Sequence, residues 1–107
     1  MSSITAWTTV SDGLIVEDEV RFSLVELCRA CGTDSGRISA LVAEGILGPA
    51  GQGPDDWLFS GPALRTTRTA LRLANDLELS PAATALVLEL LEEIAALRTR
   101  LRREQAV

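Results

Sequence analysis

The sequence contains no histidine, no lysine and no tyrosine, so all ten of its basic residues are arginine. Without histidine or lysine, the chain has no imidazole base, no amine that could form a Schiff base and no imidazole ligand for a metal. Its serines and threonines have no base that could activate one of them as a nucleophile. We therefore expect a protein that is not an enzyme and that holds no cofactor and no metal.

Cysteines and long apolar runs are also scarce. Cys28 and Cys31 are too few for a disulfide framework, and the chain does not open with a secretory-signal pattern. No apolar run reaches the roughly 18 residues of a membrane span, because Glu89, Glu92 and Glu93 interrupt the richest segment. These absences predict a cytoplasmic protein. Its 107 residues suffice for one domain with a modest core.

Positive charge is missing mainly from the first half of the chain. Ten arginines stand against 15 acidic residues, for a net charge of -5. Residues 1–61 carry three arginines and nine acidic residues, whereas residues 62–107 carry seven and six. A protein that held nucleic acid mainly by its phosphates would need a cationic surface. The acidic half therefore argues against nucleic acid as a partner, and it serves either solubility or the binding of a basic protein.

The first helix is the clearest of the predicted elements. Ser23 and Glu26 have the spacing of a capping box, apolar residues follow at helical intervals, and Gly32 ends the helix. A short strand at residues 20–22 leads into it. Residues 1–19 are predicted to be an N-terminal extension that forms a hairpin around an Asp-Gly turn.

A second short helix is predicted over residues 34–44. Thr33 is its expected N-cap and Gly45 its C-terminal stop. Two short helices joined by so tight a turn form a helix-turn-helix. The side chains expected to face inward from the second helix are Ile38, Leu41 and Val42.

A small β-wing and a third helix are expected next. The apolar segments 46–47 and 57–59 are predicted to pair across a loop rich in glycine and proline. The third helix is predicted to begin at Ser60–Pro62 and to end near Leu79. Residues 20–79 would together form a winged helix-turn-helix domain. The predicted inward face of the third helix consists of Leu64, Leu71, Ala74 and Leu77.

Residues 80–107 are predicted to form one long C-terminal helix. Ser80 is its expected cap and Pro81 its first residue, and it can continue to about Glu104. Such a helix would extend about 36 Å, more than a small core requires. Its heptad pattern predicts a homodimer, and the alternative is an amphipathic helix folded back on its own domain. The predicted dimerisation residues are Val87, Leu90, Ile94, Leu97 and Leu101.

The order of these elements resembles the MerR-like winged-helix superfamily over residues 20–104. Within it, the sequence is similar to the CbpM chaperone-modulator family. The segments that carry this resemblance are FSLVELC at 22–28, GILGP at 45–49, WLF at 57–59, LRL at 71–73, Leu77 and LRTRL at 97–101. The resemblance implies a mainly α fold, namely a MerR-like winged helix-turn-helix with a small β-wing and a long C-terminal dimerisation helix.

The resemblance also implies a function. Members of the family bind the J-domain of a DnaJ-like co-chaperone, CbpA, and block its work with the Hsp70 chaperone DnaK. It further implies an antiparallel dimer, although β-branched residues at the a positions with leucine at d mildly favour a parallel one. We follow the resemblance, because so short a seam specifies orientation weakly.

The outward face of the second helix is poorly equipped to bind DNA. Gly36, Ala40 and Ala43 cannot form side-chain hydrogen bonds with base edges. Asp34 and Glu44 flank this stripe of small residues. The stripe either admits the close approach of a partner helix or is an ordinary helix surface.

The predicted wing leads to a similar expectation. Asp55 and Asp56 would repel phosphates and would favour the basic second helix expected of a J-domain. Trp57 follows them, and it is either a half-buried strand residue or an anchor for the partner. The candidate partner-binding residues are therefore Asp34, Gly36, Ala40, Ala43, Glu44, Asp55, Asp56 and Trp57.

Arg65, Arg68 and Arg72 recur at helical spacing on the third helix. This basic stripe could touch a nucleic-acid backbone, or its arginines could pair with acidic residues and lie over apolar neighbours. The C-x-x-C spacing of Cys28 and Cys31 occurs in redox and zinc sites, but both lie on the apolar face of the first helix without a second ligand pair. We interpret them as packing residues.

The sequence therefore predicts a non-enzymatic chaperone modulator that binds a J-domain and acts as a homodimer. The alternative is a MerR-like DNA-binding transcriptional regulator that reads a palindrome as a dimer. A domain that binds another protein partner is a third possibility.

Overall fold

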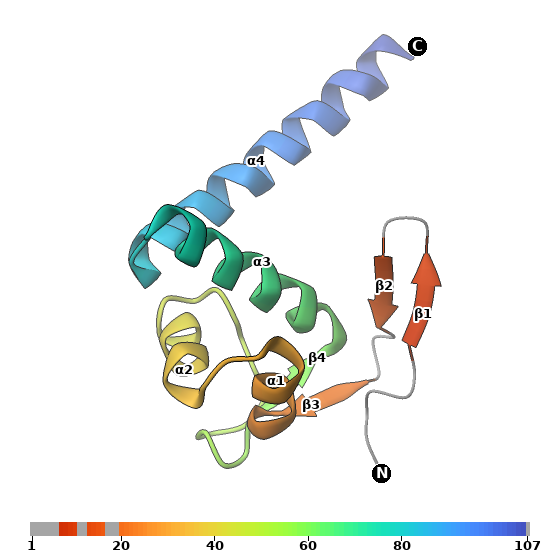
Figure 1. Cartoon of the computed structure of the whole chain (residues 1–107). Helices are drawn as coiled ribbons and strands as arrows, with labels where there is room; N and C mark the ends of the chain where they lie inside the picture. Colours follow the sequence, from red (N-terminus) through yellow and green to blue (C-terminus); the bar gives the residue numbers. More distant parts are fainter. Residues whose placement is uncertain (1–6, 11–12, 17–19, 107) are drawn as a thin grey trace.

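The computed structural model of the chain describes residues 7–10, 13–16 and 20–106, the first two ranges by their backbone alone (Figure 1). Four helices dominate it, as the sequence predicts. A globular unit built from the first three helices carries the long fourth helix, which projects away from it (Figure 1). The elements in chain order are β1 (Trp7–Val10), β2 (Gly13–Val16), β3 (Arg21–Ser23), α1 (Leu24–Cys31), α2 (Ser35–Ala43), β4 (Leu58–Ser60), α3 (Gly61–Leu77) and α4 (Pro81–Gln105).

The described residues form two separate two-stranded sheets. β1 and β2 pair antiparallel, which is the arrangement expected for the N-terminal hairpin, although Gly13 belongs to β2 and not to the turn. Residues 11–12 lie outside the described part of the chain. In the second sheet, β3 and β4 pair antiparallel with Phe22 opposite Phe59.

The predicted pairing of residues 46–47 with residues 57–59 is wrong. The backbone N–H groups of Ile46 and Leu47 donate to the carbonyl oxygen of Leu41 at 2.9 and 3.4 Å, so they close the end of α2 and are not available to a strand. β4 pairs with β3 instead, and a single bridge between Ala50 and Leu58 remains of the expected wing ladder.

The helix-turn-helix is fixed by local capping interactions. Ser23 Oγ accepts from the Glu26 amide at 3.1 Å, and Glu26 Oε1 accepts from the Ser23 amide at 2.9 Å, which confirms the capping box. Gly32 ends α1 in the left-handed conformation with a φ of 66°, as expected. The predicted Thr33 cap of α2 is wrong. The Thr33 amide donates to Cys28 in the closing turn of α1, and Asp34 caps α2.

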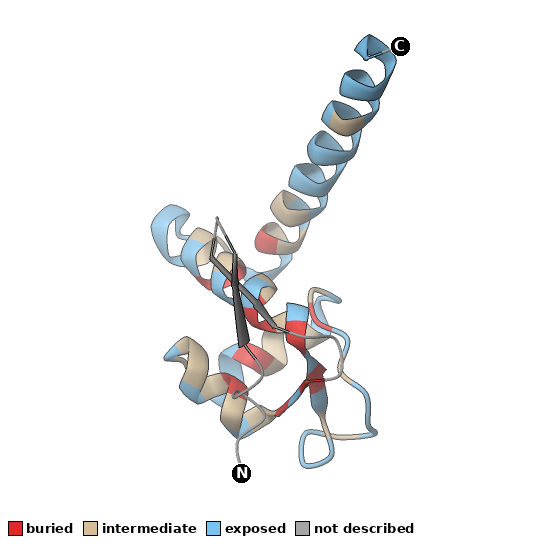
Figure 2. Ribbon diagram, turned by 90° about the vertical axis from the view of Figure 1, so that its right-hand side faces the viewer, coloured by how far each residue is buried: buried red, intermediate tan, exposed pale blue. Residues whose placement is uncertain are grey.

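The hydrophobic core lies between the β3–β4 sheet and the first three helices (Figure 2). Ile38 and Leu41 of α2 are buried as predicted, and Val42 is half-buried. Leu77, predicted to face inward, is 59% exposed because the last turn of α3 extends past the core to the corner with α4. The buried apolar residues are Val20, Phe22, Leu27, Ile38, Leu41, Leu47, Phe59, Leu64, Ala70 and Leu71.

Only the first turns of α4 pack against the globular unit. Ser80 Oγ accepts from the Ala83 amide at 3.1 Å and Pro81 begins the helix, as the sequence predicts. Thr84 is buried and Leu88 packs partly against the core, whereas most of the remaining helix is exposed (Figure 2). No helix in the described residues is both long and apolar enough to cross a membrane.

Candidate functional site

The first group of predicted partner-binding residues lies on α2. Asp34 is exposed, and its Oδ1 accepts from the Arg37 amide at 2.9 Å, so one carboxylate oxygen serves as the helix cap. Glu44 is exposed at the other end of the helix. A Cβ at Gly36 would lie 3.2 Å from Asp34 Oδ1, which makes the small residue part of the cap geometry. Two alanines complete this face: Ala40 is half-buried and Ala43 is exposed.

Arg37 is the only cation of α2, and it is already engaged. Its Nη2 donates to Asn75 Oδ1 at 3.0 Å, which joins α2 to α3. The exposed surface of this helix therefore consists of small side chains, the guanidinium of Arg37 held against Asn75, and a carboxylate at each end.

The second group lies in the wing loop, residues 51–57. Asp55 and Asp56 are exposed, and the Asp56 amide donates to the Gly53 carbonyl at 2.9 Å. Gly51 has a φ of 108°, and a Cβ there would lie 2.6 Å from the Asp56 carbonyl oxygen. Only glycine fits this close approach of backbone, so the loop holds its two carboxylates in a defined turn.

Trp57 anchors the wing loop to the domain. It is half-buried, and its ring meets the buried ring of Phe59 edge-on, with centroids 5.9 Å apart at an interplanar angle of 81°. Trp57 is thus half-buried as expected, but it lies just before β4 and not within a strand. Leu58 faces outward between the two aromatic residues and is exposed.

The structure does not bring all predicted residues into one constellation. Asp55, Asp56 and Trp57 are neighbours in one turn. Asp34 and Glu44, by contrast, lie at opposite ends of α2. Within the described ranges, no hydrogen bond or ion pair joins the two groups. The candidate surface is thus an extended acidic face with an aromatic residue at its wing edge.

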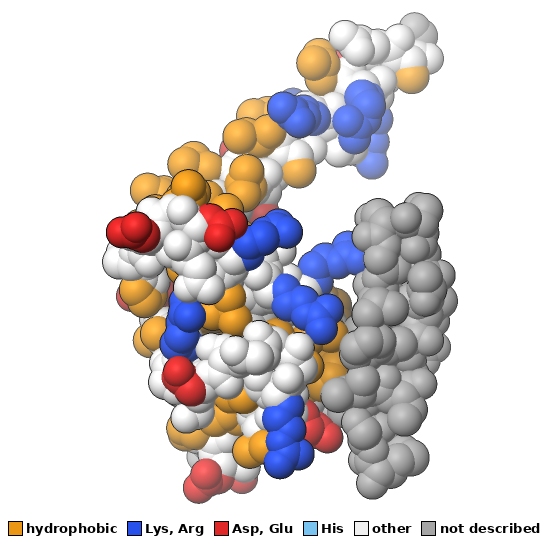
Figure 3. All heavy atoms as spheres, viewed as in Figure 1, with side chains coloured by type: hydrophobic (Ala, Val, Ile, Leu, Met, Phe, Trp, Pro, Cys, Tyr) orange, Lys and Arg blue, Asp and Glu red, His pale blue; other side chains and the backbone are white. Residues whose placement is uncertain are grey.

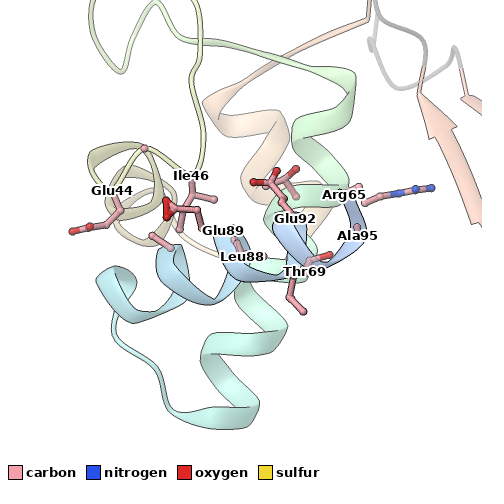
Figure 4. Close-up of a pocket in the computed structure, with 12 residues that line it drawn as sticks. Glu44, Ile46, Arg65, Thr69, Leu88, Glu89, Glu92 and Ala95 are labelled. Carbon is pink, nitrogen blue, oxygen red and sulfur yellow. The ribbon is translucent and has the colours of Figure 1, made fainter. Parts of the chain in front are cut away.

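A groove at the junction of α2, α3 and α4 was not predicted. Its volume is about 480 Å³, and Figure 4 shows the residues that line it. Glu44 and Ile46 follow α2, Thr69 lies on α3, and Leu88, Glu89 and Glu92 lie on α4. Because three segments distant in sequence form it, no local sequence pattern could have revealed it. Glu44 is its only lining residue among the predicted site residues.

The arginine stripe of α3 has a partly structural role. Arg68 Nη2 donates to the carbonyl oxygen of Ala30 at 3.2 Å, near the C-terminus of α1. Arg65 and Arg72 are exposed on the same helix. In Figure 3, arginines gather over the middle of the domain and again on the distal half of α4. Arg68 thus contacts a backbone carbonyl of its own chain, and this hydrogen bond is not the predicted pairing with an acidic residue.

Cys28 and Cys31 are free, half-buried and packed against the core. Burial raises the pKa of both thiols, and the charge of Asp34 raises the pKa of Cys28 further. Arg68 opposes the effect of burial at Cys31. No cluster of three His, Cys, Asp or Glu side chains that could hold a metal is found in the part of the chain that the structure describes. These contacts support the interpretation of both cysteines as packing residues.

The arrangement of a helix-turn-helix, a short sheet beside it, a third helix and a projecting fourth helix defines a winged helix-turn-helix protein of the MerR type. In agreement, residues 22–104 match the model of the MerR HTH family regulatory proteins. A Pseudomonas putida protein is 38% identical over 90 residues, which cover 84% of this chain and 85% of that relative. Relatives from Pseudomonas entomophila and Coxiella burnetii are 36% and 30% identical with the same coverage.

All three relatives are named chaperone modulatory protein CbpM. The chain belongs to the CbpM family within the MerR-like helix-turn-helix proteins. This confirms the resemblance drawn from the sequence segments, and it supports a role as a chaperone modulator.

Proposed function

We propose that this chain is a cytoplasmic chaperone modulator that binds the J-domain of a DnaJ-like co-chaperone of the CbpA type and inhibits its cooperation with DnaK. Membership of the CbpM family supports the modulator role. The J-domain as the target is what the resemblance to the CbpM family implies, and the acidic charge of the exposed helix-turn-helix and wing is compatible with it.

The acidic character of these two elements is the observation that carries the proposal. In a MerR-like fold that bound DNA, α2 and the wing would face the phosphates. Here Asp34 and Glu44 lie exposed at the ends of α2, and Asp55 and Asp56 lie exposed in the wing loop. The one cation of α2, Arg37, bonds to Asn75. Such a surface favours a basic helix and speeds its encounter.

Apolar groups beside the carboxylates would supply affinity. Leu58 is exposed next to the half-buried Trp57, and Ala43 is exposed on α2. Complementary charges contribute more to association rate and specificity than to affinity, so burial of these apolar groups has to stabilise the complex.

We further propose that the protein is a homodimer joined through α4. The seam residues Leu90, Ile94 and Leu97 are exposed along the part of α4 that leaves the globular unit. An antiparallel pairing sets the acidic first half of α4, with Glu89, Glu92 and Glu93, beside the arginine-rich second half of the other copy. A parallel pairing would set like charges side by side. The arginines concerned are Arg98, Arg100, Arg102 and Arg103.

The decisive experiment measures binding of the purified J-domain to the chain and to its Asp55→Lys/Asp56→Lys variant at low and high salt. We expect the dissociation constant of the variant to rise about tenfold and that of the native chain to rise with salt, because screening weakens charge attraction. In parallel, the native chain should suppress the co-chaperone-stimulated ATPase of DnaK, and the variant should suppress it less.

A matched control reverses two acidic residues outside the proposed surface. Asp76→Lys/Glu78→Lys makes the same change in net charge at the exposed corner between α3 and α4. This variant should bind the J-domain almost as the native chain does. A tight complex that responds neither to salt nor to the wing substitutions contradicts the proposed surface.

A DNA-binding regulator is the second candidate, because the matching family model describes regulatory proteins. α2 carries Gly36, Ala40 and Ala43 where base-reading side chains would be needed. Specific retardation of operator DNA by the isolated protein in a gel-shift assay at moderate salt would favour this candidate. We expect no specific retardation.

A further inference from the structure

The groove between α2, α3 and α4 lies on the side of α4 that faces away from the predicted dimer seam. Its lining on α4 includes Ala85, Leu88 and Glu92, which recur at spacings of three and four and therefore share one face of the helix. The seam residues Leu90 and Ile94 are offset from this series by two positions, so they lie on the opposite face. A second α4 paired along the seam therefore leaves the groove of each copy open.

The groove combines an apolar floor with an acidic rim. Ile46 and Leu88 are half-buried, and they pack against the core while their outer surface lines the groove. Glu44 at the end of α2 and Glu89 and Glu92 on α4 are exposed. Among the described residues, no cation forms an ion pair or a hydrogen bond with these three carboxylates. Both the apolar surface and the negative charge are therefore accessible to a partner.

The basic residue of the lining does not neutralise this charge. Arg65 lines the groove from α3, but Figure 4 shows its side chain extending away from Glu89 and Glu92. The groove therefore favours positive groups. Its occupant has to supply apolar side chains and cations together, and one face of a basic amphipathic helix has this composition.

The size and the position of the groove fit the side chains of such a helix. Its volume of about 480 Å³ lies within the range of ligand-binding clefts. Glu44 belongs both to the groove and to the acidic surface of α2. A helix that meets the acidic end of α2 therefore reaches the groove without a break in the surface.

We propose that the groove receives the basic helix of the partner J-domain, with an apolar side chain over Ile46 and Leu88 and cationic side chains beside Glu89 and Glu92. The inference rests on the J-domain partner proposed above, and it adds an apolar anchor for that complex at the junction of α2 and α4. Because the seam lies on the other face of α4, dimerisation and J-domain binding use separate surfaces. A dimer then binds two J-domains.

Charge reversal in the groove provides the first test. Glu89→Lys/Glu92→Lys should raise the dissociation constant of the J-domain complex about tenfold, because the groove then repels a basic helix. Asp76→Lys/Glu78→Lys makes the same change in net charge outside the groove lining and should bind almost as the native chain does. Isothermal titration calorimetry measures both affinities, and the native chain should bind one J-domain per chain.

The outcomes separate this inference from the proposed function. A native chain that binds no J-domain refutes the proposed function and this occupant of the groove together. If the native chain binds and the wing variant Asp55→Lys/Asp56→Lys is weakened, but Glu89→Lys/Glu92→Lys binds normally, the groove alone is refuted.

Filling the groove provides a second test without any change in charge. Ala95 is exposed and lines the groove, so the indole of Ala95→Trp would occupy it and should raise the dissociation constant about tenfold. Ala96→Trp places the same side chain at the next residue, which is also exposed but lies outside the lining, and should change the constant less than about twofold. Equal losses of affinity in the two variants contradict docking in the groove.

The dimer variant examines the separation of the two faces of α4. Ile94→Asp/Leu97→Asp should bind the J-domain with native affinity, because its substitutions lie opposite the groove. Loss of binding in this variant would mean that the partner needs the seam, and it overturns the assignment. Association of the native chain beyond a dimer in sedimentation equilibrium, abolished by Ala95→Trp, would place another copy of the chain in the groove and also overturns it.

Discussion

Replacement of Ile94 and Leu97 by aspartate should convert the protein into a monomer without unfolding it. Both side chains lie at the centre of the predicted seam, and both are about half exposed in the single chain, at 45% and 50%. The substitutions therefore remove little that the globular unit uses. They remove the apolar surface that a second α4 would cover, and they would place four carboxylates in the dimer interface.

The exposed fractions set the size of the effect. Complete burial of a leucine or isoleucine side chain contributes about 2 kcal/mol, so a half-exposed one has about 1 kcal/mol left to gain. Leu90 and Leu101 are 55% and 54% exposed, and these fractions are similar to those of Ile94 and Leu97. Two copies thus offer eight such side chains, and the double variant removes four. Losing about 4 kcal/mol of the free energy of association raises the dissociation constant of the dimer about a thousandfold. Burial of the new carboxylates would raise it further.

Sedimentation equilibrium provides the measurement. The native protein should approach twice the chain mass of 11.4 kDa, and the double variant should remain at that mass. Leu77→Asp is the matched control for Leu97→Asp, because Leu77 is 59% exposed but lies outside α4. An unchanged mass for the double variant would refute the seam, and so would an equal loss of dimer in the control.

Four further predictions concern stability, measured by urea unfolding of the native chain and each variant under conditions that keep the protein monomeric. Gly51→Ala should lower the free energy of unfolding by about 2 kcal/mol, because its φ is 108° and its Cβ would meet the Asp56 carbonyl; an unchanged midpoint contradicts the turn geometry. Thr67→Val should raise it by about 1 kcal/mol, because the fully buried Oγ1 has no hydrogen-bond partner; a loss of stability would indicate one. Ser23→Ala should lower it by about 1 kcal/mol through loss of the α1 cap, and a neutral result is inconsistent with the capping box. Burial raises the folded-state pKa of Cys31 above its ordinary value of 9.0, so folding favours the neutral thiol; this stabilisation is complete below pH 9 and is lost as the pH rises further. The Cys31→Ala variant should retain only the loss that the raised pKa of Cys28 causes, and an unchanged pH dependence contradicts the contribution of Cys31.

Local chemistry explains why the helices could be predicted. A capping box is complete within four residues, so Ser23 and Glu26 mark the start of α1 without reference to the rest of the chain. The same holds for Ser80 and Pro81 at the start of α4. Where two neighbouring residues both have capping side chains, as at Thr33 and Asp34, the sequence alone leaves the choice open. The backbone bond from Thr33 to Cys28 decides it.

Nonlocal pairing explains what could not be predicted. β4 pairs with β3, and the paired residues Arg21 and Ser60 lie 39 positions apart in the sequence. Periodicity within either segment therefore carries no record of the pairing. The candidate functional site likewise has one part that the sequence predicts and one part that it does not. The acidic residues and the aromatic residue were evident as chemistry, but the groove beside Glu44 depends on how three helices meet.

The β3–β4 sheet has a consequence for the order of folding. Its three residue pairs close a loop of more than thirty residues, which costs about 3 kcal/mol of chain entropy. α1 and α2 form through contacts close in sequence and shorten that loop when they pack, so the sheet closes late. The wing loop is anchored by Phe59 and Trp57 on this sheet. Its carboxylates are therefore held in place only once the whole domain has assembled.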